Sequence, residues 1–174
     1  LYFNTENLYP HDLHLIDGLR KCGNEIKEVT AGKYNSYFNL AKNIKKQSGD
    51  TDAIIIGFTS PLLAIISRFV TTKKIIFNAV SSQYEANAIS RNTHENKIIL
   101  NLKWWLIDFL SFHFSTKVLL ESRAQIDFIH RLFLVPKKKL VLSYSGISEK
   151  DFYFDPSIKK RTKFTVLFRG RFLP

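Results

Sequence analysis

The sequence predicts an α/β protein with a Rossmann-like, doubly wound parallel sheet that carries helices on both faces. The first observation is order: apolar runs of strand length alternate with segments of helical spacing about six times along the chain. The second is Ala53–Gly57, whose three consecutive Ile are typical of a strand buried on both faces. The third is composition, because 45% hydrophobic and 24% charged residues suffice for a core and exclude wholesale disorder.

Each expected strand is a short apolar run that ends at polar or turn residues. Right-handed crossovers through the intervening helices would join these runs into one sheet. In chain order the expected strands are Leu1–Asn4, Glu25–Thr30, Ala53–Gly57, Lys74–Asn78, Lys117–Leu120, Leu140–Leu142 and Phe164–Phe168.

The expected helices begin and end at residues with capping chemistry. Gly23 follows a segment of helical spacing and stands where a C-cap belongs. Ser60 with Pro61, and later Ser122, supply a hydroxyl cap or a first-turn proline. The expected helices are 13–22, Tyr37–Ser48, Leu62–Val70, Ile98–Phe114 and 122–134, and 81–96 is expected to be a polar connection.

Several classes of site are excluded by missing residues. The first expected strand is followed by residues 4–10 without a glycine, so a dinucleotide fingerprint is absent, as is the phosphate-loop pattern. One cysteine excludes a disulfide framework and a Cys-based zinc site, and we expect Cys22 to be an inert buried thiol. His11 and His14 lie three apart without an evident third ligand, so we expect no metal and no cofactor.

The net charge of +11 is unevenly spread. Residues 1–116 hold 13 Lys/Arg against 10 Asp/Glu, a net +3, whereas residues 117–174 hold 13 against 5, a net +8. This basic third suits an anionic partner such as an anionic membrane surface. The alternative is a lysine-rich surface that is only solvated. Nucleic acid is not expected, because the aromatic residues follow core periodicity rather than forming exposed stacking platforms. Trp104 and Trp105 lie in a helix that is apolar nearly all round, which fits a buried helix or an interfacial one.

The most apolar stretch, 98–120, contains Lys103, Asp108, His113 and Lys117. A bilayer-spanning helix does not carry charges at that density. We therefore expect a cytoplasmic location, with peripheral attachment to the inner face of the membrane as an alternative.

Four segments stand in a particular order: 9–12 (YPHD) with 15–26 (LIDGLRKCGNEI), 117–122 (KVLLES), 135–152 (VPKKKLVLSYSGISEKDF) and 164–171 (FTVLFRGR). Their order and spacing resemble those of group 1 glycosyltransferases, family 4 in the sequence classification. The resemblance spans nearly the whole chain. It departs from the family pattern in having no glycine-rich turn at 4–7, no His at 78–82, and no two Glu eight residues apart.

The resemblance implies a GT-B fold, in which two Rossmann-like domains face each other across a cleft. Residues 1–154 would be the acceptor-binding domain, 155–163 a linker, and 164–174 the first strand of a donor-binding domain. The full-length protein would be an enzyme that moves a sugar from a nucleotide-sugar donor to a glycan, lipid-linked or other hydroxyl acceptor with retention of configuration. The donor machinery would lie beyond Pro174, and we expect this chain alone not to transfer sugar.

The resemblance and the strand order together select the site residues. Ligands of such sheets bind beyond the carboxyl ends of the strands, where a hydroxyl acceptor needs hydrogen-bonding side chains. Gly170 and Arg171 would bind the donor phosphates, since a guanidinium binds phosphate oxygens bidentately. We name no catalytic residue. The candidate acceptor-binding residues are Asn4, Thr5, Thr59, Ser60, Asn78, Ser81, Ser82, Tyr84, Glu121 and Ser145.

Two other interpretations remain at this stage. One is a basic Rossmann-like module that binds a membrane or nucleic acid without catalysis. The other is a different GT-B enzyme, such as a nucleotide-sugar epimerase. The residues after Pro174 would discriminate between these classes.

Overall fold

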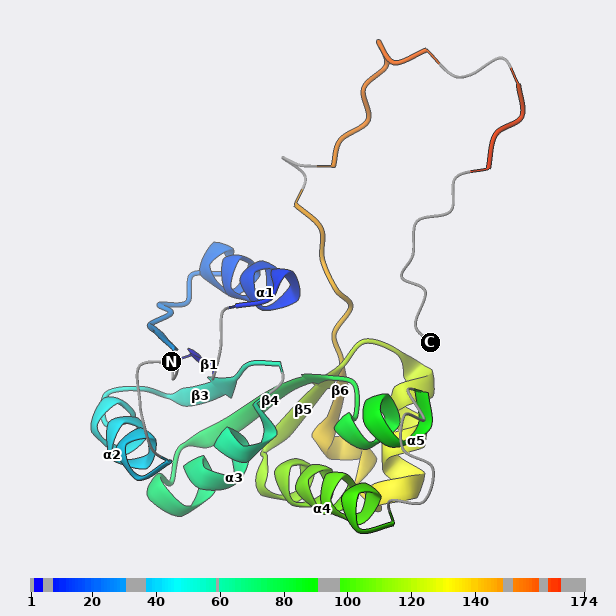
Figure 1. Ribbon diagram of the computed structural model, residues 1–174. Helices are drawn as coiled ribbons and strands as arrows, with labels where there is room; N and C mark the ends of the chain where they lie inside the picture. The colour runs from blue at the N-terminus through cyan, green and yellow to red at the C-terminus, as the bar shows by residue number, and fades with distance from the viewer. Residues whose placement is uncertain are drawn as a thin grey trace.

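A computed structural model describes residues 2–4, 8–30, 37–58, 60–90, 98–148, 152–159 and 163–166. These residues form one six-stranded parallel sheet with helices on both faces, which confirms the predicted α/β, Rossmann-like class (Figure 1). In chain order the elements are β1 (Tyr2–Asn4), α1 (Pro10–Lys21), β2 (Glu28–Thr30), α2 (Tyr37–Gln47), β3 (Ala53–Ile56), α3 (Pro61–Val70), β4 (Lys74–Val80), η2 (Glu85–Ser90), α4 (Ile98–Phe114), β5 (Lys117–Leu120), α5 (Arg123–Phe133), η3 (Lys137–Lys139) and β6 (Leu140–Leu142).

The strand order is β2-β1-β3-β4-β5-β6, so the chain reverses direction across the sheet once. It moves outward from β1 to β2, returns to the other side of β1 at β3, and then continues to β6. This is the flavodoxin-like order, extended by one strand. Sheets of this kind usually bind ligands at the carboxyl ends of their strands, near such a reversal, which here falls between β1 and β3.

Alternation along β3 shows how the two faces of the sheet are covered. Ile54 and Ile56 belong to the main core with buried residues of α2, α3, α4 and α5, whereas Ile55 packs with Ile16 of α1 in a smaller second cluster. Figure 1 shows α1 on one side of the sheet, with α3 and α4 on the other. Within the part of the chain that the structure describes, most of the hydrophobic core therefore lies on one face, and α1 covers part of the other.

The main core is rich in aromatic contacts. The rings of Phe112 and Phe133 lie 5.3 Å apart, edge to face, and both side chains are fully buried. Trp105 stacks on Phe133 at 5.9 Å and on Phe109 at 5.1 Å. Aromatic pairs in these geometries stabilise beyond the area that they bury, so α4 and α5 are locked together across the end of β5.

The expected element boundaries are mostly confirmed. Ser122 caps α5, because its hydroxyl accepts a hydrogen bond from the backbone N–H of Gln125 at 3.2 Å. Gly23 follows α1 with a φ of +83°, as expected for the residue after a C-cap. Ser60 precedes α3, but its side chain makes no capping hydrogen bond. The polar connection contains a helical segment that was not expected, η2.

The final expected strand, Phe164–Phe168, does not form in the part that can be checked. Residues 164–166 are exposed and have no strand assignment, and 167–168 lie outside the described residues. The division into residues 1–154, 155–163 and 164–174 stays a prediction.

Burial predicts a contrast between two helical leucines. Leu63 in α3 is fully buried, whereas Leu102 in α4 is 59% exposed. We expect Leu63→Ala to lower the free energy of unfolding by about 2–5 kcal/mol, through lost burial and the cavity left behind. Leu102→Ala, the matched control, should change it by less than about 0.5 kcal/mol. Urea unfolding followed by circular dichroism measures both, and equal losses would show that the helices pack differently.

Candidate acceptor site at the carboxyl edge of the sheet

A cleft of about 300 Å³ opens between α1 and the carboxyl ends of β4, β5 and β6. Its size falls at the lower end of the range for small-molecule sites. One wall is a single face of α1 with i, i+3, i+4 spacing, and the other walls come from the strand ends and the segment after β6. The lining residues are His11, His14, Leu15, Gly18, Leu19, Cys22, Asn78, Val80, Glu121, Ser143, Tyr144, Ser145 and Gly146.

Asp12 fixes the α1 wall of this cleft. Its side chain is fully buried in the first turn of α1. One carboxylate oxygen accepts hydrogen bonds from the backbone N–H of Phe58 at 3.2 Å and from the side-chain amide of Asn78 at 3.0 Å. The other accepts the backbone N–H of Tyr9 at 3.3 Å. Asp12 thereby joins the start of α1 to the ends of β3 and β4.

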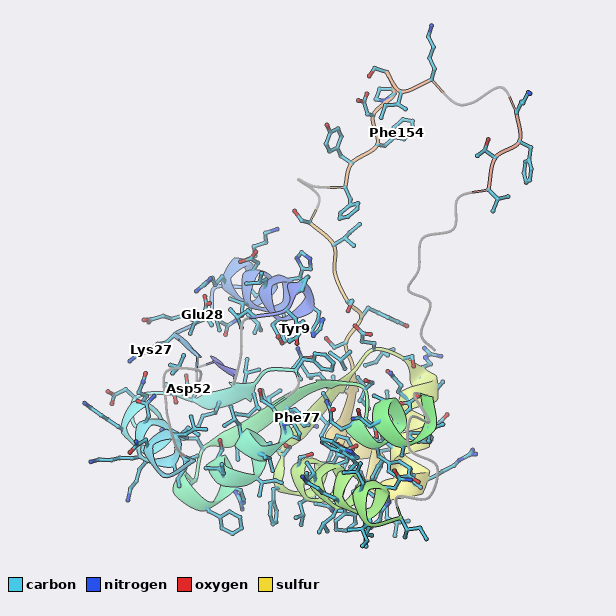
Figure 2. The ribbon with its side chains drawn as sticks, in the orientation of Figure 1. Tyr9, Lys27, Glu28, Asp52, Phe77 and Phe154 are labelled. Carbon is cyan, nitrogen blue, oxygen red and sulfur yellow. The ribbon has the colours of Figure 1, made fainter. Side chains whose placement is uncertain are left out.

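An aromatic cluster supports the same junction. The ring of His11 stacks on Tyr9 at 5.8 Å and meets Phe58 edge-on at 4.8 Å. Figure 2 shows Tyr9 between α1 and the sheet. His11 Nε2 is buried and has no hydrogen-bond partner among the residues that the structure describes. A buried polar atom without a partner is costly, and this atom belongs to a residue that lines the cleft.

Glu121 and Ser145 form the polar pair on the opposite side. Glu121 follows β5 directly, and its carboxylate accepts a hydrogen bond from the Ser145 hydroxyl. The segment that carries Ser145 lies against α1, since a Cβ on Gly146 would sit 3.6 Å from Cβ of His14. A carboxylate and a hydroxyl together offer both acceptors and a donor, which is the chemistry that recognises hydroxyl groups.

Val80, which also lines the cleft, adopts an unusual backbone conformation. Its φ of +60° lies in the left-handed region, which β-branched residues rarely enter. The pairing of β4 with β5 slips between Asn78 and Val80, and the N–H of Ser81 bonds back to the carbonyl of Ala79 at 2.5 Å. Strain of this kind gathers at functional sites, and here it turns the chain away from the sheet at the edge of the cleft.

A second buried carboxylate, Asp108 of α4, organises the segment after β4. It accepts the Ser82 hydroxyl at 2.7 Å and the backbone N–H of Tyr84 at 2.8 Å, and Ser82 in turn accepts the N–H of Glu85 at 3.0 Å. Burial raises the pKa of Asp108 to about 6, even though these two hydrogen bonds favour the charged form. This network explains why a polar connection folds into η2.

The structure thus separates the predicted acceptor-binding and donor-phosphate-binding residues. Asn78, Glu121 and Ser145 line the cleft together. Ser60, Ser82 and Tyr84 do not line it: Ser60 and Ser82 are buried hydrogen-bonding residues, and the ring of Tyr84 packs on Phe133. Ser81 is half-buried beside the turn at Val80. Asn4 ends β1, and Thr5, Thr59, Gly170 and Arg171 lie outside the described residues.

The sequence analysis missed the α1 wall. The signal was available, since His11, His14, Leu15, Gly18, Leu19 and Cys22 share one helical face. The expectation of a buried Cys22 is wrong: the thiol is exposed at the cleft, because the helix ends there without a covering element. No group of three or more His, Cys, Asp or Glu side chains that could hold a metal occurs among the described residues.

Comparison of the chain with protein-family models, with curated proteins and with solved structures finds no significant match.

Loss of the Asp12 carboxylate should destabilise the fold. Asp12→Ala leaves the Phe58 N–H and the Asn78 amide buried without this acceptor, at about 1–3 kcal/mol for each group. We expect a total loss of about 2–5 kcal/mol in the free energy of unfolding. Asp17→Ala, in the same helix at an exposed position, is the control and should be nearly neutral. Unfolding in urea measures both, and equal effects would contradict the role of Asp12.

Asp108 should make stability depend on pH in a defined window. Its folded pKa of about 6 exceeds the ordinary 3.8, so the folded state holds this proton more tightly than the unfolded state does. The free energy of unfolding should therefore fall by about 3 kcal/mol as the pH rises from about 4 to above 6. Asp108→Asn should remove this decline, whereas Asp17→Asn should leave it. If the free energy of unfolding changed with pH in the same way for Asp108→Asn and the wild type, Asp108 would not be the group that causes the decline.

Proposed function

We propose that this protein is the acceptor-binding half of a retaining glycosyltransferase, which presents a hydroxyl acceptor to a nucleotide-sugar donor. One observation carries the proposal: three segments that resemble group 1 glycosyltransferase motifs, far apart in the sequence, meet at one cleft. Segment 9–26 supplies His11 and His14, segment 117–122 supplies Glu121, and segment 135–152 supplies Ser145 and its neighbours. Ligand binding at this edge is also the rule for parallel α/β sheets.

The side chains in the cleft suit a sugar. Glu121 accepts hydrogen bonds from hydroxyl groups, and Ser145 and Asn78 supply further polar atoms. Leu15 and Leu19 of α1 provide an apolar surface against which the less polar face of a sugar ring packs. Ligand sites usually have mostly apolar walls that carry a few precisely positioned polar groups.

Transfer from a nucleotide sugar develops negative charge on the leaving diphosphate, which cations or helix N-termini must stabilise. Gly170 and Arg171, which the resemblance selects for that role, lie outside the described residues, so their part stays a prediction. The acceptor side of the reaction belongs to the cleft. Its task is to bind and orient one hydroxyl, and no residue is assigned as a catalytic base.

Binding of glycans without transfer tests the proposal. Ligand-observed NMR on the whole chain, with a panel of methyl glycosides and short oligosaccharides, should find at least one that binds. Glu121→Gln should weaken that binding by about 10-fold or more, since a hydrogen bond to a charged group contributes about 1.5–3 kcal/mol. Glu25→Gln, an exposed carboxylate before β2, is the matched control and should bind as the wild type does.

Two outcomes would contradict the proposal. One is that no glycoside in the panel binds, while a nucleotide or a nucleic acid does. The other is that Glu121→Gln and Glu25→Gln weaken glycoside binding equally, because the cleft would then not be the binding site.

A further inference from the structure

The outer face of α4 is apolar and uncovered. Ile99, Leu102 and Leu106 recur at i, i+3 and i+7, so they form one stripe, and their side chains are 86%, 59% and 47% exposed. The opposite face of the helix carries the buried Asp108 and Phe112. Within the described residues, nothing packs over the stripe. It lies on the side of the sheet away from α1, and therefore away from the α1 wall of the cleft (Figure 1).

A basic pocket adjoins the last turn of α4. It has a volume of about 450 Å³, and His113 and Phe114 of α4 form part of its lining. Its four cationic side chains are those of Arg68, Lys117, Lys138 and Lys139, and no carboxylate lines it.

The four cations differ in how they are paired. The Lys139 amine donates to the carbonyl of His113 at 2.5 Å, and the Lys117 amine donates to the carbonyl of Lys138 at 2.7 Å. Burial and the neighbouring Arg68 lower the pKa of Lys139, so positive charge is crowded here. The side chains of Arg68 and Lys138 have no recorded hydrogen-bond or ion-pair partner in the described part of the chain, and both are exposed. These two groups are free to meet an anion.

Aromatic side chains connect the apolar stripe to the basic pocket. Phe114, at the end of α4, meets Phe69 of α3 edge-on at 5.4 Å. Phe69 is 75% exposed and directly follows Arg68 in sequence. Two aromatic rings, one at the end of the stripe-bearing helix and one exposed, therefore border the cationic group.

We propose that the α4 stripe and the basic pocket together form a docking surface for an anionic lipid bilayer. The apolar side chains enter the interfacial region, while Arg68 and Lys138 meet headgroup phosphates. An amphipathic helix lies in the plane of the interface in this way, and its binding combines buried apolar area with attraction to anionic lipids. No helix among the described residues is long and apolar enough to cross a membrane, so the contact is peripheral. This inference does not depend on the proposed function.

Charge complementarity selects the bilayer over other occupants. A bilayer surface with anionic lipid presents apolar chains and phosphates side by side, which matches an apolar stripe bordered by unpaired cations. A second copy of the chain would offer an apolar stripe but would bring the same cations, and a free phosphate would leave the stripe uncovered.

Flotation with lipid vesicles tests the docking surface. The whole chain should float with vesicles of phosphatidylcholine mixed with phosphatidylglycerol, and not with phosphatidylcholine alone. Binding should disappear at 1 M salt, where the Debye length falls to about 3 Å from about 10 Å at 0.1 M. Equal behaviour with both kinds of vesicle would overturn the proposal.

Charge-matched variants locate the contact. Arg68→Gln with Lys138→Gln should weaken vesicle binding about 25-fold, since each cation near an anionic surface contributes about fivefold. Lys45→Gln with Lys46→Gln, exposed in α2, removes the same charge and should weaken binding by about fivefold or less. Equal losses in the two pairs would mean that net charge alone acts, which would overturn the docking site.

Apolar variants test the stripe and its occupant. Leu102→Gln with Leu106→Gln should weaken vesicle binding about 10-fold or more, whereas Leu13→Gln, exposed in α1, should have little effect. Light scattering after size exclusion should find the same mass for the wild type and the double variant. A wild-type dimer that the double variant abolishes would assign the stripe to a second copy and overturn the proposal. Pyrophosphate binding that is as tight as vesicle binding, and that the leucine changes do not affect, would also overturn the proposal.

Discussion

The right-handed crossover between parallel strands is the constraint on which the rest of this structure depends. Once handedness is fixed, the direction in which the chain moves across the sheet decides which face each helix covers. Only the step from β1 to β2 runs towards one edge, so among the described helices α1 stands alone on its face. The later steps run the other way, and α2, α3, α4 and α5 share the main core. The cleft exists because one helix cannot cover six strands.

A buried carboxylate, that of Asp12, fixes the start of α1 against the sheet. Topology brings the start of α1 near the ends of β3 and β4, and among the described residues the apolar cluster beneath it is smaller than the main core. Asp12 holds it there by accepting hydrogen bonds from both strand ends. Asp108 acts in the same way on the other face, where it orders the segment after β4. Two buried carboxylates, those of Asp12 and Asp108, thus fix the two polar connections that border the sheet edge.

Hydrophobic periodicity and capping signals were sufficient to predict the six strands of the sheet and most helices, because these signals are local, but they also predicted a strand at Phe164–Phe168 that does not form at 164–166. Lys117–Leu120 and Leu140–Leu142 form as the apolar runs indicate, and Ser122 caps as its position indicates. The cleft was less predictable, because its lining depends on contacts between distant residues. Nothing near Ser82 shows that its hydroxyl is taken by Asp108, 26 residues away, rather than offered to a ligand. The apolar stripe of α4 could not be predicted for a different reason. The helix is apolar nearly all round, so its sequence does not show which face is left uncovered.

The solitary position of α1 also bears on the dynamics of the molecule. Segments held by few buried side chains open at a lower free energy than the core, as separate cooperative units. α1 meets that description among the described residues, where its cluster holds two buried hydrophobic residues, Ile16 and Ile55, and five partly buried ones beside the Asp12 hydrogen bonds. Its backbone amides should therefore exchange with solvent before those of α3 and α4. A ligand seated against α1 in the cleft would therefore slow this exchange.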